Sequence, residues 1–135
     1  MTPAGLELLK SFEGFDANPY RDTGGILTVG FGTVFPLTRD EAGLLLESRV
    51  NAFEEDIRVL VQQPISENRF DALTSFAYNV GIGAFRNSTL LAKLNEGDLE
   101  AVPGQMRLWV HDHSGRVQQG LVKRRAAEAA LWEKG

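Results

Sequence analysis

The chain has 135 residues, a length that favours one domain (1–135) with a core that needs neither disulfides nor metals. It has no cysteine, which excludes a disulfide framework, a cysteine-based zinc site and a thiol nucleophile. Its 14 Lys and Arg against 18 Asp and Glu give a net charge of −4, which argues against a nucleic-acid partner. No apolar run approaches the roughly 20 residues of a membrane span, so no stable membrane insertion is expected.

The first predicted element is a helix at the N-terminus. Thr2 is a favourable N-cap, and Pro3 suits the first helical position. Leu6, Leu9 and Phe12 recur at helical spacing, and Gly14 is a plausible stop. The same segment, from Met1 to Glu7, lacks the basic and apolar regions of a signal peptide, so none is expected.

A small β region is predicted over about 19–36. A turn at Asp22–Gly25 is followed by a run rich in β-branched and aromatic residues, interrupted by glycines. This pattern indicates a hairpin whose glycines permit tight bends or a close approach of the backbone.

A helical body is predicted over about 38–133. Its helices are bounded by caps and by proline or glycine stops. The predicted segments are a helix from Thr38 to about Val61, one from Ser66 to Gly81, one from Ser88 or Thr89 to Gly97, one from Asp98 with a break at Pro103–Gly104, a loop at 111–116, and a final helix from about Gln119 to Trp132. The predicted fold is therefore α+β, mainly helical, with a cleft between the β region and the helical bundle as the natural ligand site.

The sequence lacks the residues that several other catalytic mechanisms need. There is no Gly-x-Ser-x-Gly motif and no phosphate-binding glycine loop. His111 and His113 share one predicted loop, with Asp112 as the only nearby further ligand, so a solvated loop is favoured over a metal site. No metal and no cofactor are expected.

Carboxyl groups remain as candidates for catalysis. Glu13 ends an apolar helix between Phe12 and Phe15, and apolar surroundings disfavour the charged form of a carboxyl group, as a general acid requires. Asp22 opens a turn beside Gly24 and Gly25, where backbone donors favour an ionised carboxylate. Two carboxyl groups in opposite environments are typical of glycoside chemistry. By spacing alone, however, a structural role for both is the commoner interpretation.

The pattern Glu13-x8-Asp22-x5-Thr28 resembles the catalytic signature of the phage-type lysozymes, the T-even and lambdoid endolysins of glycoside hydrolase family 24. The resemblance runs in order through most of the chain. It includes the segments 12–15, 19–22, 27–32, 70–73, 76–81, 88–91, 107–110 and 120–128.

The resemblance implies hydrolysis of the β-1,4 bond between N-acetylmuramic acid and N-acetylglucosamine in peptidoglycan. Glu13 would protonate the leaving oxygen, and Asp22 would stabilise positive charge on the sugar and help to position water. Thr28 would hold that water on the opposite face, which implies inversion and a separation of the carboxyl groups of about 6.5–9.5 Å.

Further site residues are implied with less specificity. Asn79 and Trp109 would lie at the floor of the cleft, although plain core packing is an equal interpretation for Trp109. The basic run Lys123–Arg125 is also consistent with a solvated helix face. The resemblance implies that one guanidinium of the pair Arg124 and Arg125 lies near Glu13 or the cleft, with Arg125 favoured. Tyr20, Gly30 and Phe31 are candidates for contact with sugar, each also consistent with a structural role.

Two departures from the family pattern affect the β region. Thr33 stands where the family usually has a histidine in a structural ion pair, whose loss would cost about 1–3 kcal/mol if partly buried. The loop over 33–38 is shorter than in most lambdoid relatives, which would remove surface from the cleft.

Two alternatives stay open at this point: an inactive wall-binding relative, and a lytic transglycosylase, which needs no water-positioning carboxylate. The resemblance further implies a monomer made in the host bacterial cytoplasm. Its partner would be peptidoglycan, reached by holin-dependent release.

Overall fold

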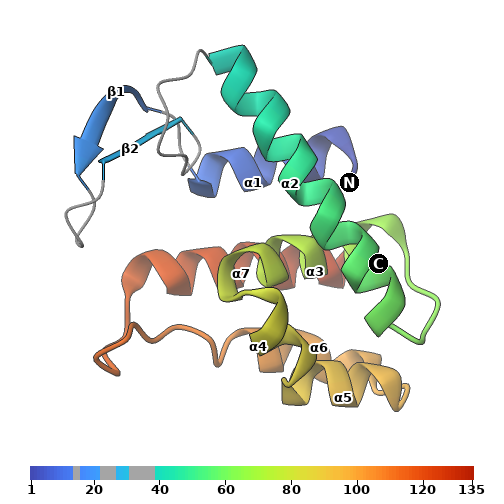
Figure 1. Cartoon of the computed structure of the whole chain (residues 1–135). Coiled ribbons are helices and arrows are strands. Elements are labelled where there is room, and N and C mark those ends of the chain that lie inside the picture. The colour runs from blue at the N-terminus through green and yellow to red at the C-terminus, as the bar shows by residue number, and fades with distance from the viewer. Residues whose placement is uncertain (14–15, 22–26, 31–38) are drawn as a thin grey trace.

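The computed structural model describes residues 1–13, 16–21, 27–30 and 39–135 (Figure 1). Within these ranges the protein is mainly helical. The elements in chain order are α1 (Pro3–Glu13), β1 (Asp16–Arg21), β2 (Leu27–Gly30), α2 (Arg39–Leu60), α3 (Glu67–Val80), α4 (Ile82–Arg86), α5 (Thr89–Asn95), the 3-10 helix η1 (Leu99–Ala101), α6 (Val102–Met106) and α7 (Gln119–Glu133).

Helix α1 begins as its capping residues predict. The Oγ1 atom of Thr2 accepts a hydrogen bond from the backbone N–H of Gly5 at 3.0 Å, and Pro3 is the first helical residue. The same hydroxyl donates to Oδ2 of Asp71, a buried residue of α3. The N-terminal cap therefore also fastens α1 to α3.

Gly5 of α1 lies directly against the side chain of Asp71 in α3. A Cβ atom added at Gly5 would lie 2.7 Å from Cγ of Asp71, closer than real carbon atoms pack. Gly5→Ala is therefore expected to lower the free energy of unfolding by about 1–3 kcal/mol, because the gain in helix propensity is smaller than the cost of overpacking. Urea denaturation measures this change.

Gly43 of α2 is the matched control for Gly5, since its added Cβ atom would meet only Nζ of Lys10, at 3.7 Å. Gly43→Ala is expected to stabilise the protein by about 0.5–1 kcal/mol through helix propensity. Equal effects of the two substitutions would contradict the close approach described at Gly5.

Strands β1 and β2 pair antiparallel, with Tyr20 opposite Thr28 and Arg21 opposite Leu27. Strand β1 begins at Asp16, before the predicted boundary near residue 19. The register of its pairing with β2 shifts between Asp16 and Tyr20. Asp16, Ala17 and Asn18 are weak strand formers, and the pairing of Asp16 with Gly30 carries the strand further than local propensity indicates. The turn that was predicted to join the strands, at 22–25, lies outside the described residues.

The boundaries of the later helices follow local capping. Ser66 accepts from the backbone N–H of Arg69, and Ser88 from that of Leu91. Gly81 ends α3 with a φ of 97°, a conformation that glycine adopts without strain. The predicted cap of α2, Thr38, lies outside the described residues, and α2 ends at Leu60, before Pro64.

The predicted break near Pro103 falls just before it. The chain forms η1 after Asp98 and then α6, with Pro103 in the first turn of that helix. A proline costs little there because the N–H groups of the first turn have no intrahelical partner.

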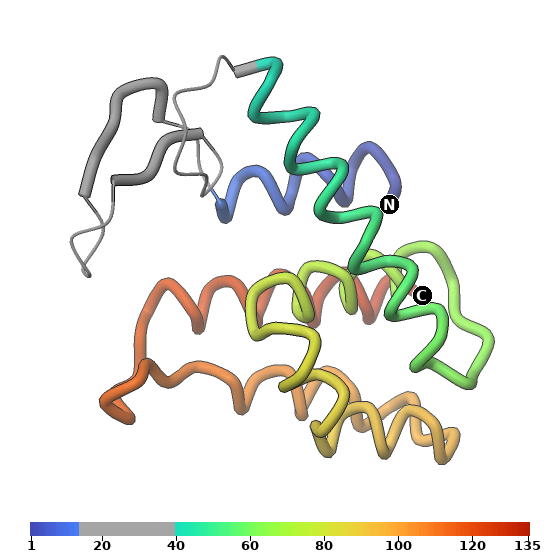
Figure 2. The backbone as a smooth tube through the Cα atoms, in the orientation of Figure 1, coloured from blue at the N-terminus to red at the C-terminus, as the bar shows by residue number. Residues whose placement is uncertain are grey.

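The core lies between α3 and α7 and extends toward the short helices. Figure 2 shows the chain leaving α3, passing through α4, α5 and α6, and returning along α7. Fully buried Phe76, Phe85, Met106 and Trp132 belong to one apolar cluster, and Leu9, Leu46 and Val50 form a smaller one between α1 and α2. Within the described ranges, no helix is both long and apolar enough to cross a membrane.

Candidate active site

Glu13 is the last residue of α1, and its side chain is one-fifth exposed. Its Oε2 atom accepts a hydrogen bond from Nη1 of Arg124, in α7, at 2.9 Å. The ring of Phe12 lies against the same guanidinium, 4.9 Å from Cζ to the ring centroid. Glu13 thus lies beside a guanidinium from the basic run of α7, and the ring of Phe12 covers that guanidinium.

One guanidinium of the basic pair does lie beside Glu13, but it belongs to Arg124, so the preference for Arg125 at that position is wrong. Successive residues of a helix point about 100° apart, which turns Arg125 toward α3. There its guanidinium lies over the ring of Phe76 at 4.9 Å, and its Nη2 atom donates to Oδ1 of Asn79.

The interpretation of Lys123–Arg125 as a solvated helix face is also wrong for both arginines. Arg124 is 5% exposed and Arg125 is fully buried. Their charges face Glu128, one turn further along α7 and also fully buried. The helix therefore carries two arginines into the protein, where a buried carboxyl group compensates them.

Glu128 is held by three partners. Its Oε2 atom accepts from Oγ of Ser75 at 2.6 Å and from Nε of Arg124 at 3.2 Å, and its Oε1 atom lies 3.2 Å from Nε of Arg125 as an ion pair. Burial raises the pKa of Glu128 against the lowering effect of both arginines. Burial likewise lowers the pKa of Arg125 to about 10, against the attraction of Glu128, so this arginine stays charged at neutral pH.

A pocket of about 450 Å³ opens beside Glu13. Its lining comes from the end of α1, the end of α3 and the start of α7: Phe12, Glu13, Asn79, Gln118, Gly120, Leu121 and Arg124. The structure thus brings together two predicted site residues, Glu13 and Asn79, that are far apart in the sequence. A carboxyl group, an amide and a guanidinium in one open pocket can bind a polar substrate and exchange a proton with it.

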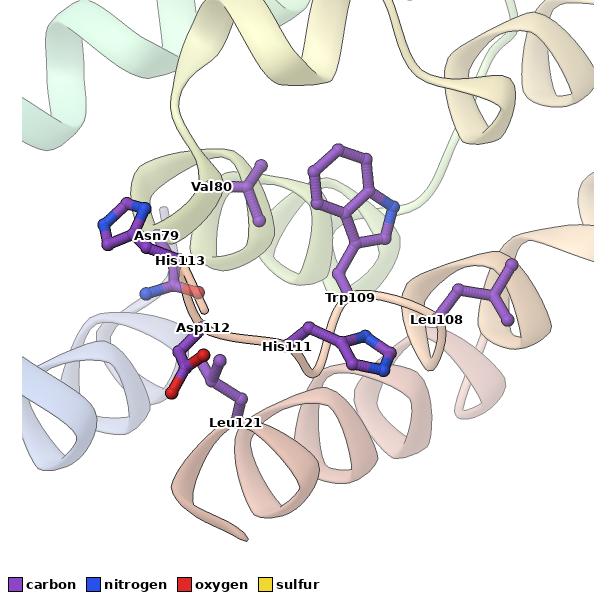
Figure 3. Close-up of a pocket in the computed structure, with 8 residues that line it drawn as sticks. All are labelled: Asn79, Val80, Leu108, Trp109, His111, Asp112, His113 and Leu121. Carbon is purple, nitrogen blue, oxygen red and sulfur yellow. The ribbon is translucent and has the colours of Figure 1, made fainter. Parts of the chain in front are cut away.

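A second pocket, of about 550 Å³, adjoins the first, since Asn79 and Leu121 line both. Figure 3 shows its residues, which come from the end of α3, the segment after α6 and the start of α7. They are Asn79, Val80, Leu108, Trp109, His111, Asp112, His113 and Leu121. The two pockets together provide room for a ligand longer than one ring.

Trp109 packs in the core, which was one of its two interpretations, and it also lines a pocket. Its ring packs edge-on against Phe76, with 5.6 Å between centroids and 90° between planes, and it is attached to the main apolar cluster. It also lines the second pocket. The indole is therefore part of the core and of the pocket wall at once.

The other predicted site residues belong to the β region. Asp22 and Phe31 lie outside the described residues, as do Thr33 and the loop over 33–38. Tyr20 and Thr28 face each other in the backbone pairing of β1 and β2, and Gly30 pairs with Asp16. Their proposed roles stay predictions.

Several residues of the site were missed from the sequence: Ser75, Gln118, Leu121 and Glu128. For α7, the sequence did contain one indication that charged residues are buried. Its buried residues, Arg124, Arg125, Glu128, Ala129 and Trp132, share one helical stripe, so charged residues in register with an apolar tryptophan indicate a buried polar cluster.

The segment after α6 is organised around Asp112. Its Oδ1 atom accepts hydrogen bonds from Oγ and the backbone N–H of Ser114 and from the backbone N–H of Arg116. Within the described ranges, no group of three or more His, Asp or Glu is arranged to hold a metal ion.

The Ser114 hydroxyl, followed by the other donors, lowers the pKa of Asp112 to about 2. The pKa of Asp112 in the folded protein is below its ordinary value of 3.8, because the hydrogen bonds favour the ionised carboxylate. The stabilisation from these hydrogen bonds is therefore fully present above pH 3.8, and it is lost as the pH falls through about 2 and the carboxylate becomes protonated. The amide chemical shifts of Ser114 and Arg116 are therefore expected to stay constant from neutral pH to pH ~4 and to move between pH ~3 and ~2. Asp112→Asn should remove this titration, and a shift that persists in that variant would contradict the assignment.

The mainly helical fold, with Glu13 at the end of α1 beside a pocket, is that of lysozyme-like proteins of known structure. The muramidase domain of SpmX from Asticaccaulis excentricus has this fold: it superposes with a TM-score of 0.88 at 34% identity, over 97% of this chain and 95% of that one. The sequence model described as phage lysozyme matches residues 10–128. The chain belongs to the phage lysozyme family, and the resemblance seen in its motifs is confirmed.

Sequence relatives agree with this assignment. The endolysin of Bacillus phage PZA is 40% identical over all of this chain, and this chain spans 55% of the length of that relative. The SAR-endolysin of Bacteriophage PS119 is 37% identical over 90% of this chain and 78% of its own length.

Proposed function

We propose that this protein is an endolysin-type muramidase that hydrolyses the β-1,4 bond between N-acetylmuramic acid and N-acetylglucosamine in bacterial peptidoglycan. The observation that carries the proposal is Glu13: a carboxyl group at a helix end, partly exposed to a pocket, with one oxygen held by a buried arginine. Membership of the phage lysozyme family and the collinear Glu13, Asp22 and Thr28 support it.

In this proposal Glu13 protonates the glycosidic oxygen as the bond to the leaving sugar breaks. Asp22 stabilises the positive charge that develops on the other sugar, and Asp22 and Thr28 place the attacking water on the opposite face. The carboxyl groups of Glu13 and Asp22 are then about 6.5–9.5 Å apart, and the configuration at the reacting carbon is inverted.

The substrate is proposed to lie in a cleft between the β region and the helical body. Asn79 and Trp109 line the adjoining pockets on the helical side. Tyr20, Gly30 and Phe31 are the proposed contacts on the β side. No cofactor is required, because the two carboxyl groups supply the acid and the stabilising charge.

Clearing of purified peptidoglycan, followed by mass spectrometry and NMR of the products, tests this function. Hydrolysis gives a product with a free reducing end, and inversion gives the α-anomer first. A product lighter by one water would identify a lytic transglycosylase instead. Binding to the wall without clearing would identify an inactive wall-binding relative.

We further propose that the protein acts as a monomer and reaches the wall from the host cytoplasm by holin-dependent release. The SAR-endolysin names of relatives from Bacteriophage PS119 and Escherichia phage Mu point to signal-anchor-release as the competing route. Expression in a host with and without a holin distinguishes the two, since holin-independent lysis would contradict the proposed route.

A further inference from the structure

We infer that Glu128 is a positioning residue that orients the two polar side chains of the candidate active site, Glu13 through Arg124 and Asn79 through Arg125. The expected effect of Glu128 on the rate of peptidoglycan cleavage rests on the proposed function.

The first arm of this arrangement runs from Glu128 to Glu13. Oε2 of Glu128 holds Nε of Arg124, and the backbone carbonyl of Ser75 accepts from Nη2 of Arg124 at 3.0 Å. The ring of Phe12 covers the guanidinium. With Nε and Nη2 occupied, the planar guanidinium has one orientation, in which Nη1 points at Oε2 of Glu13.

The second arm runs from the other oxygen of Glu128 to Asn79. Oε1 of Glu128 faces Nε of Arg125, whose Nη2 atom donates to Oδ1 of Asn79. The ring of Phe76 supports this guanidinium as that of Phe12 supports the first. One buried carboxyl group therefore fixes both arginines, and the arginines fix two residues that line the same pocket.

Stability alone does not account for this cluster. Removing charged groups from water is costly, and buried ion pairs are often replaced by apolar side chains with no loss of stability. A rigid polar support does account for it, because a displacement of about 1 Å in a catalytic group costs up to about 100-fold in rate. Glu128 itself is fully buried and cannot touch a substrate, so its removal should act on kcat rather than on KM.

The test is Glu128→Gln, which keeps the shape of the side chain and removes its charge. The amide nitrogen of glutamine would face a guanidinium N–H, so at least one arm loses its anchor. We expect kcat on purified peptidoglycan to fall by about 10- to 100-fold, with KM within about threefold of the wild type. The crystal structure of the variant should show at least one of two contacts broken: that between Arg124 and Glu13, or that between Arg125 and Asn79.

Glu54→Gln is the matched control. Glu54 is also a buried carboxyl group, 4% exposed, but it pairs with the N-terminal ammonium group and Arg58, away from both pockets. A general effect of losing a buried charge would lower kcat in both variants, whereas the positioning role lowers it in Glu128→Gln alone.

A folded Glu128→Gln variant with wild-type kcat, or with the Arg124–Glu13 and Arg125–Asn79 contacts both intact, would overturn the inference. If Glu128→Gln does not fold, Ser75→Ala removes the hydroxyl that holds Oε2 of Glu128, and unchanged kcat there would also overturn it. If the wild type does not cleave peptidoglycan, the proposed function fails. The crystal structure of the Glu128 variant then decides the positioning role by itself.

Discussion

Glu13→Gln is expected to clear purified peptidoglycan about 100- to 10,000-fold more slowly than the wild type, the range that a positioned general acid contributes. Glutamine matches glutamate in size, and its carbonyl oxygen can still accept the hydrogen bond from Arg124 that the carboxylate accepts at 2.9 Å. It cannot deliver a proton to the glycosidic oxygen. Initial rates of turbidity loss measure the effect, and circular dichroism verifies that the variant is folded.

The matched control for Glu13 is Glu7→Gln on the same helix. Glu7 is three-quarters exposed and forms an ion pair with Lys10 at 3.6 Å. It should clear the wall at the wild-type rate, because exposed ion pairs of this kind contribute little. Equal, high activity of folded Glu13→Gln would show that another group donates the proton.

Phe76→Ala is expected to lower the free energy of unfolding by about 3–5 kcal/mol, the cost of removing a buried phenylalanine. The Phe76 ring is fully buried between Phe85 and Trp109, with centroids 6.4 Å and 5.6 Å away. Such a loss is a large part of the roughly 5–15 kcal/mol that stabilises a domain. Urea denaturation followed by far-ultraviolet circular dichroism measures it.

Leu44→Ala serves as the control for Phe76→Ala. Leu44 is a large apolar residue of α2 but is 67% exposed, so its truncation should change the free energy of unfolding by less than about 0.5 kcal/mol. If the two substitutions cost the same, the packing around Phe76 is not the core of this protein. Because Phe76 also supports Trp109 and Arg125, Phe76→Ala should reduce activity even in the folded fraction.

The sequence by itself determined the helix boundaries that depend on local capping. Thr2, Ser66 and Ser88 begin helices because their side-chain oxygens accept from backbone N–H groups three residues later, an interaction that needs no distant partner. The final helix, predicted from Gln119 to Trp132, runs to Glu133. The order of the motifs along the chain also indicated the phage lysozyme family, since a motif is a property of the sequence alone.

Only the tertiary structure decided which charged residues are buried and which residues they contact. Glu13 and Arg124 are separated by 111 positions, and their contact exists because α1 and α7 both pack against α3. From the sequence, Arg124 and Arg125 are equivalent members of one basic run. Their different partners follow from the rotation of α7 against α3, which places one guanidinium at Glu13 and the other at Asn79. That rotation is set by the packing of Trp132 and Ala129 in the core, and packing between distant helices cannot be inferred from local periodicity.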